Sequence, residues 1–222
     1  MNNIYISIGA QCTTATLFDM LEVKKETLPF DWMFSTPHFV YSIIKQLVID
    51  NKEIDYIVDN HFFLCDKRAI LYDGEHHIFF ENGPVLVNSK YNVCFPHDTL
   101  PDRDKYIRRI ERLKQLILDN ETNLTFVYVS VSSPDIGNYK MENVEPIQQL
   151  YEYIDKINSI LKEVRTNYKI LIFDTNKPID IINPDILHIS YYDIEQKNHW
   201  KLLLPELINT CNNLIKNEVI YK

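Results

Sequence analysis

Hydrophobic and polar positions along the chain predict strands and helices in alternation. Residues 4–8 (Ile-Tyr-Ile-Ser-Ile) form a short apolar run rich in β-branched side chains, which is typical of a buried strand, and Gly9 ends it. A helix is predicted from about 13 to 21, and a second helix near Pro37 carries Val40, Ile43, Ile44 and Leu47 on one face. A third helix is predicted to end near 118, and two more are predicted over 144–164 and 202–215. The other predicted strands cover 124–131, 170–173 and 186–189.

The order of these elements predicts the fold class. In the second half, helices alternate with strands, which favours a parallel sheet with helices packed on both faces. We therefore expect an α/β fold of three layers around a mostly parallel sheet. Thr99 to Asp102 match an N-terminal capping pattern and are expected to open the helix that ends near Leu118.

Residues 61–94 have a different pattern. Short β-type runs cover 61–65, 69–72, 77–80 and 85–87, and Asp73-Gly74 and Asn82-Gly83 lie between successive runs. Such dipeptides suit tight hairpin turns, which need positive φ angles. We expect an antiparallel hairpin insertion here, within a single α/β domain that covers 1–222 with the insertion at about 61–98.

Composition narrows the possible functions. The net charge is −8, which disfavours a nucleic-acid-binding surface because phosphate neutralisation needs clustered Lys and Arg. No segment reaches the roughly 18 consecutive apolar residues of a membrane span, and the N-terminus lacks a signal-peptide pattern, so a cytoplasmic location is expected. The four cysteines, Cys12, Cys65, Cys94 and Cys211, contain no C-x-x-C pair, and we expect free thiols, no metal and no cofactor.

The first candidate for chemistry is Cys12, which follows the first predicted strand and precedes a helix. Ligands bind beyond the carboxyl ends of parallel strands, and the free N–H groups of a helix N-terminus favour an anion. A thiolate is such an anion, and positions of this kind lower the pKa of a cysteine. The alternative is a small buried cysteine that only packs.

The second candidate is the segment Cys94-Phe95-Pro96-His97-Asp98. A thiol nucleophile needs a base, and His97 is suited to that role, with Asp98 available to contact substrate or an arginine. Equally, both residues can be ordinary loop residues, with Asp98 helping to cap the following helix.

Arg108, Arg109 and Arg112 form the one basic cluster. Arg108 and Arg112 are four residues apart and share a helix face, and the planar guanidinium group suits carboxylate or phosphate. The alternative is a solvated face that pairs with Glu111 and nearby acids.

Two further segments contain candidate residues. His199, in Asn198-His199-Trp200, follows the last strand, and this layout resembles the SGNH hydrolases. Those enzymes, however, use Ser as the nucleophile and place their Asp three residues before the His, whereas Asp193 lies six residues before His199. Asp31 lies between Phe30 and Trp32, where it can orient a histidine or bind substrate, or simply make a backbone turn contact.

Four motifs in order resemble the family described as putative papain-like cysteine peptidases. They are Ser7-Ile8-Gly9-Ala10-Gln11-Cys12, Leu28-Pro29-Phe30-Asp31-Trp32, Phe95-Pro96-His97-Asp98, and Tyr106 to Arg112. The resemblance implies Cys12 as the nucleophile and His97 as the base, in the papain chain order of Cys before His.

We therefore expect a cysteine-dependent hydrolase or acyltransferase acting on a small-molecule, peptide or glycan substrate. In this hypothesis Cys12 attacks, His97 or His199 handles the proton, and Asp31 or Asp98 orients or binds; the expected substrate-binding residues are Gly9, Gln11, Trp32, Arg108, Arg109 and Arg112. Two alternatives stay open. One is a glycan- or nucleotide-sugar-acting transferase that uses His97, Asp98 and the arginines, and the other is a non-enzymatic binding protein.

Overall fold

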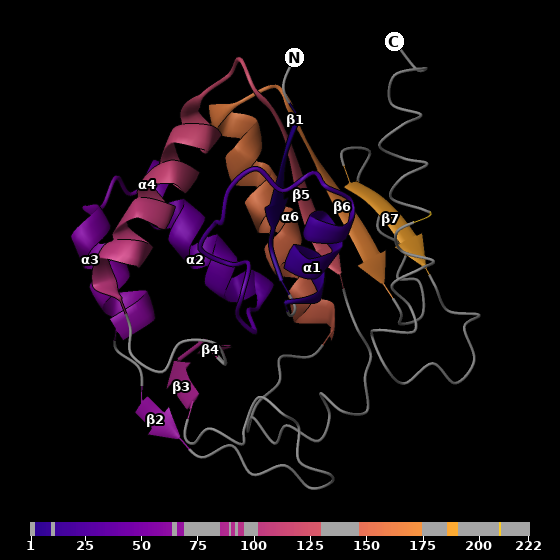
Figure 1. The fold of residues 1–222 in the computed structure, drawn as a ribbon. Helices are drawn as coiled ribbons and strands as arrows, with labels where there is room; N and C mark the ends of the chain where they lie inside the picture. The colour runs from indigo at the N-terminus through magenta and orange to yellow at the C-terminus, as the bar shows by residue number, and fades with distance from the viewer. Residues whose placement is uncertain are drawn as a thin grey trace, which may run out of the picture.

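Four parallel strands form the central sheet, in the order β1-β5-β6-β7 (Figure 1). They are β1 (Asn3–Ser7), β5 (Asn123–Val129), β6 (Tyr168–Asp174) and β7 (Ile186–Ser190). Phe126 is paired with Ile6 on one side and with Ile170 on the other, and Ile170 is paired with Ile186. The structure, a computed structural model, describes residues 3–9, 12–63, 66–68, 85–88, 90–91, 93–95, 102–129, 147–174, 186–190 and 209. The predicted parallel sheet is confirmed.

The described helices are those that the apolar periodicity predicts, with one addition. They are α1 (Thr13–Met20), α2 (Pro37–Val48), α3 (Ile54–Val58), α4 (Arg103–Leu118) and α6 (Ile147–Val164). The predicted apolar face of α2 is buried, and Thr36 caps this helix by accepting a hydrogen bond from the Phe39 N–H. The predicted closing helix over 202–215 lies outside the described residues apart from residue 209.

The main core lies between one face of the sheet and the helices α2, α4 and α6. Ile6, Phe126 and Ile172 contribute from the sheet, and Ile43 and Ile110 contribute from α2 and α4. Because side chains alternate across a strand, Tyr5 lies on the opposite face, where its ring contacts Phe18 of α1 at 5.9 Å between centroids. The mixed α/β class is confirmed, while the complete three-layer arrangement and the single domain over 1–222 stay predictions.

The segment predicted as a hairpin insertion contains an antiparallel sheet in its described part. Strands β2 (Asp66–Arg68), β3 (Val85–Asn88) and β4 (Val93–Phe95) form it in that order, each antiparallel to the next (Figure 1). The predicted runs 69–72 and 77–80, with their turns, lie outside the described residues, so the hairpin insertion itself stays a prediction.

Two local predictions were wrong. Residues 61–65 were expected to form a strand, but Asp59–Phe63 form a π-helix (η1) that continues α3. Its buried residues His61 and Phe62 follow Ile57 and Val58 at a spacing of four, which is helical rather than strand-like, and packing of this face decides the structure. The N-cap of α4 is Asp102, whose carboxylate accepts from the Lys105 N–H, so the helix begins at Arg103 rather than at the predicted Thr99 cap.

Among the described residues, no helix combines the length and the apolar character that a membrane crossing requires.

Candidate functional site at the first strand-helix junction

Cys12 lies where β1 passes into α1. The strand continues its pairing to Ile8, whose N–H donates to Val127 O at 3.0 Å, and Gly9 then turns the chain with a φ of +121°. Only glycine adopts this φ without strain. Cys12 occupies the N-cap position of α1, with φ −59° and ψ −8°. The structure therefore places the cysteine at the carboxyl edge of the parallel sheet, as the sequence predicts.

Backbone contacts hold this turn. The Thr14 hydroxyl donates to Gly9 O at 2.8 Å, and the Val129 N–H donates to the same oxygen at 3.3 Å. Cys12 O accepts from the Thr16 N–H at 2.9 Å and from the Thr16 hydroxyl at 3.0 Å. The turn is thus joined both to the first turn of α1 and to the neighbouring strand β5.

The thiol of Cys12 is largely shielded from water. The residue is 9% exposed, and this burial raises the pKa of the Cys12 thiol, against a smaller lowering effect of a backbone hydrogen bond. The helix N-terminus was expected to lower this pKa, but loss of hydration outweighs it. The protonated thiol is therefore the resting form at neutral pH, and attack by this sulfur requires a base.

Two histidines, His61 and His38, have side chains that the structure describes, and each contacts other side chains. His61 is 1% exposed; its Nδ1 lies 3.0 Å from Ile57 O, and its Nε2 lies 3.2 Å from the Ser42 hydroxyl. Burial lowers the pKa of His61 to about 4, so its ring is neutral at neutral pH. His38 stacks on Tyr153 with 4.3 Å between ring centroids. The predicted site residues Gln11, His97, Asp98 and His199 lie outside the described residues.

Asp31 is built into the loop between α1 and α2. It is 2% exposed, its Oδ2 accepts from the Leu28 N–H at 2.9 Å, and Lys24 Nζ lies 3.6 Å from the same oxygen. Burial raises the pKa of Asp31, while the Leu28 hydrogen bond and the charges of Lys24 and Arg109 oppose this rise. Lys24 Nζ also lies 4.3 Å from the centroid of the Trp32 ring. These contacts give Asp31 and Trp32 a role in shaping this loop.

The three predicted arginines have different contacts. Arg112 pairs with Glu26 (Nε to Oε2, 2.5 Å) and donates to Thr27 O at 3.1 Å. Arg109 lies over the Tyr106 ring at 5.7 Å, and Arg108 is exposed. The 25–28 loop thus provides partners for Arg112 that neither the charge pattern nor the helix spacing predicts.

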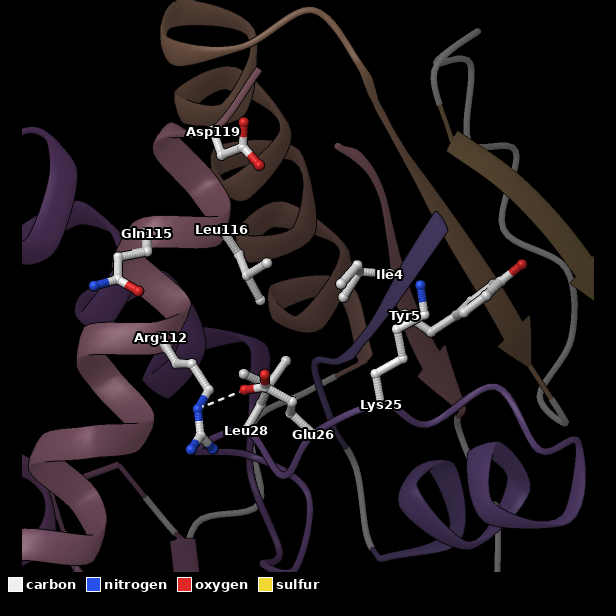
Figure 2. A pocket seen from close by; sticks show the side chains of 9 residues that line it. All are labelled: Ile4, Tyr5, Lys25, Glu26, Leu28, Arg112, Gln115, Leu116 and Asp119. Atoms are coloured by element: carbon white, nitrogen blue, oxygen red, sulfur yellow. Dashed lines mark ion pairs between the residues drawn. The ribbon is translucent and has the colours of Figure 1, made fainter. Parts of the chain in front are cut away.

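A cavity of about 240 Å³ lies beside Arg112, between α4, the 25–28 loop and the first half of β1 (Figure 2). Its apolar side chains come from Ile4, Leu28 and Leu116, and Lys25, Glu26, Asp119 and Tyr5, whose ring points away from α4, also line it. Because Ile4 and Tyr5 precede the carboxyl end of β1, this cavity is separate from the Cys12 turn.

Sequence reasoning missed Ser35 and Thr36 as neighbours of the site. A Cβ atom added to Gly9 would lie 3.1 Å from both Ser35 O and Ser35 Oγ, so the Ser35 segment packs directly on the turn. The sequence did contain one usable signal, because Thr36 before Pro37 is a typical start of a helix. Within the described part of the chain, no group of three or more His, Cys, Asp or Glu residues is placed to hold a metal ion.

The parallel sheet and the cysteine at its first strand-helix junction define an α/β protein with a candidate thiol site. The family model described as "Putative papain-like cysteine peptidase (DUF1796)" matches residues 3–176. The chain belongs to this family, as the four sequence motifs predict. No curated protein and no solved structure gives a significant match.

Proposed function

We propose that this protein is a cysteine-dependent hydrolase in which Cys12 is the nucleophile and His97 is the general base. The family description supports the class of activity, and the position of Cys12 at a helix N-terminus supports the choice of nucleophile. The first N–H groups of a helix have no partner within it, so those of α1 are suited to stabilise an oxyanion beside the sulfur.

The observation that carries the choice of His97 is the contact between Thr36 and Tyr91. The Thr36 hydroxyl donates to Tyr91 O at 3.1 Å, and the preceding residue, Ser35, packs on Gly9. Tyr91 is thus linked to the Cys12 turn through Thr36 and Ser35, and His97 follows Tyr91 by six residues. This proximity supports His97 as the partner of the thiol.

Two topological features also favour His97 over His199. Strand β5, which follows α4, runs parallel to β1, so α4 runs in the opposite direction and starts near the carboxyl ends of the strands (Figure 1). His97 precedes that start by six residues. In contrast, His199 follows β7, which is separated from β1 by β5 and β6.

In the proposed reaction the Cys12 sulfur attacks the carbonyl carbon of an amide or ester, and the thiol proton moves to His97. The carbonyl oxygen becomes an oxyanion held by backbone N–H groups of α1. When the C–N or C–O bond breaks, the leaving group takes the proton from His97. Water then attacks the thioester with His97 as base, releasing the acid and restoring the thiol. Because burial keeps the thiol protonated at rest, proton transfer accompanies the attack.

The proposal is tested with a peptidyl acyloxymethyl ketone, which alkylates catalytic cysteines, and with a panel of fluorogenic peptides and esters. Mass spectrometry of the digested protein is expected to find the probe on Cys12, and both labelling and turnover are expected to disappear in Cys12→Ala. Labelling is expected to fall at least about a hundredfold in His97→Ala, the usual contribution of a general base, and to persist in His199→Ala.

Cys211→Ala is the matched control, because it removes a thiol that the proposal does not use. Turnover that survives Cys12→Ala would overturn the proposed nucleophile. Loss of labelling in His199→Ala but not in His97→Ala would replace the proposed base.

A further inference from the structure

The hydroxyl of Thr36 makes two hydrogen bonds that join distant parts of the chain. Its oxygen accepts from the Phe39 N–H at 3.2 Å, which caps α2, and its hydrogen is donated to Tyr91 O at 3.1 Å. Thr36 and Tyr91 are 55 residues apart in sequence. One side chain therefore fixes both where α2 begins and where the chain that leads into β4 passes it.

Tyr91 is itself a rigid anchor. It is 5% exposed, its ring stacks on the buried His61 ring at 5.1 Å and 19°, and its hydroxyl lies 3.0 Å from the Ser42 hydroxyl. His61 Nδ1 faces Ile57 O, so its neutral ring donates there and its Nε2 is left to accept from the Ser42 hydroxyl or the Gln46 amide. The Tyr91 and Ser42 hydroxyls share a hydrogen bond in which either oxygen can be the donor. The anchor is thus held by both its ring and its hydroxyl.

On its other side, Thr36 is joined by one peptide bond to Ser35, which packs on Gly9. A Cβ atom on residue 9 would lie 3.1 Å from Ser35 O and Oγ and 3.3 Å from the Tyr128 ring. Gly9 O is in turn bound by the Thr14 hydroxyl, two residues after Cys12. A continuous set of contacts therefore runs from Tyr91 through Thr36, Ser35 and Gly9 to the first turn of α1.

We propose that Thr36 is a positioning residue for the Cys12 turn, which it holds closed by fixing Ser35 between the Tyr91 anchor and Gly9. The inference extends the proposed function, on which its importance for catalysis rests. It concerns the burial of the thiol, which can be measured whether or not the protein hydrolyses anything.

The test is the rate of Cys12 alkylation by iodoacetamide as a function of pH, in the full chain, with the modified peptide quantified by mass spectrometry. Thr36→Val removes both hydrogen bonds, and Thr36→Ser, which keeps the hydroxyl, is the matched control. Because burial raises the pKa of the thiol, the midpoint of the wild-type profile is expected above that of free cysteine, about 8.5. Opening the turn in Thr36→Val is expected to move the midpoint down toward that value.

A midpoint lower by about 0.5 increases the thiolate fraction at pH 7 about threefold, so the alkylation rate at this pH is expected to rise at least that much. Thr36→Ser is expected to keep the wild-type profile. A merely structural role of Thr36 would lower the melting temperature and leave the midpoint of the folded protein unchanged, and that result overturns the inference.

Thr36→Asp gives a second route if the valine variant does not fold. Aspartate is a good N-cap and can accept from the Phe39 N–H, but its carboxylate cannot donate to Tyr91 O. It therefore keeps the cap of α2 while removing the tether. Because its negative charge opposes formation of a nearby thiolate, the readout for this variant is the alkylation rate at a pH above the midpoint, which is expected to exceed that of the wild type as the sulfur becomes more accessible. An unchanged rate at that pH in a folded aspartate variant also contradicts the inference.

The failure of this inference is distinguishable from failure of the proposed function. Absence of probe labelling and turnover would remove the hydrolase proposal while leaving the alkylation midpoints to be compared. Conversely, identical midpoints in wild type and Thr36→Val, with normal probe labelling of Cys12, would remove only the role of Thr36. If the hydrolase function and the role of Thr36 are both correct, Thr36→Val is expected to lower kcat more than it raises KM, since it displaces the nucleophile rather than the substrate-binding surface.

Discussion

The Thr14 hydroxyl donates a hydrogen bond of 2.8 Å to the carbonyl oxygen of Gly9. This bond folds the start of α1 back onto the end of β1 and encloses Cys12 in the turn between them. The same carbonyl receives the Val129 N–H, so the turn is held by the helix that it starts and by the strand beside it. The position of the cysteine is therefore a property of the sheet edge as well as of the local sequence.

Gly9→Ala is expected to destabilise the protein by about 1–3 kcal/mol, because the residue has a φ of +121° and a Cβ there would press on Ser35 and Tyr128. Chemical denaturation at equilibrium measures the change. Glu22→Gly is the matched comparison, since exposed Glu22 also has a positive φ, of 54°, but is not glycine. That change is expected to be neutral or to stabilise slightly. Equal stability of Gly9→Ala and wild type would show that the turn relaxes freely.

Arg165→Met is expected to destabilise the protein by about 2–3 kcal/mol, the effect of leaving several buried carbonyl groups without a donor. The Arg165 guanidinium is buried and donates to Leu116 O and Ile117 O at the end of α4, and to Thr122 O and Asn167 O. Arg165→Lys keeps the positive charge but has a shorter side chain with fewer donors, and its stability is expected to lie between those of wild type and Arg165→Met. Urea denaturation gives the free energies, and a methionine variant as stable as wild type would contradict this role.

His61 is expected to make stability depend on pH between about 6.5 and 4. Its folded-state pKa is lowered to about 4 from an ordinary value of 6.5, so the unfolded chain binds more protons in this range. Stability is therefore complete above the unfolded pKa and falls as the pH drops toward 4, by on the order of 3 kcal/mol.

The comparison that isolates this effect is His61→Gln, whose amide oxygen can still accept from Ser42 but does not titrate. Its unfolding free energy, measured at a series of pH values, is expected to have a shallower slope than that of the wild type. Lys90→Met is a second variant, because the charge of Lys90 contributes to the low pKa of His61. It is expected to shift the loss of stability to a narrower pH range. A His61→Gln slope equal to the wild-type slope would refute the assignment.

Asp31→Ala is expected to destabilise the protein by about 2 kcal/mol, because it leaves the Leu28 N–H and Lys24 without their buried acceptor. Asp31→Asn keeps an acceptor for Leu28 and is expected to lose less. Because burial raises the pKa of Asp31, the stabilising effect of its protonated form is present below the ordinary value of 3.8 and is lost as the pH rises through the raised pKa. The difference in stability between Asp31→Asn and wild type is therefore expected to be smallest near neutral pH. Thermal denaturation of both variants at two pH values measures this.

The sequence predicts best where one local pattern decides the structure. The apolar run of residues 4–8 predicts β1, and the spacing of Val40, Ile43, Ile44 and Leu47 predicts the buried face of α2. The pattern fails at residues 61–65, where phenylalanines suit a strand and a helix alike, and only packing onto α2 and α4 selects the π-helix. Likewise, the spacing of Arg108 and Arg112 indicates a shared face but not the partner Glu26.

By itself the sequence determined the parallel α/β class, the family and the position of Cys12 between the first strand and the first helix. Each of these depends on residues that are neighbours along the chain or on an ordered set of short motifs. Only the tertiary structure decided that the thiol is buried with a raised pKa, that Ser35 packs on Gly9 and that Thr36 is hydrogen-bonded to Tyr91. The physical reason is that burial and long-range hydrogen bonds arise from segments brought together by packing, and no local pattern specifies which segments those are.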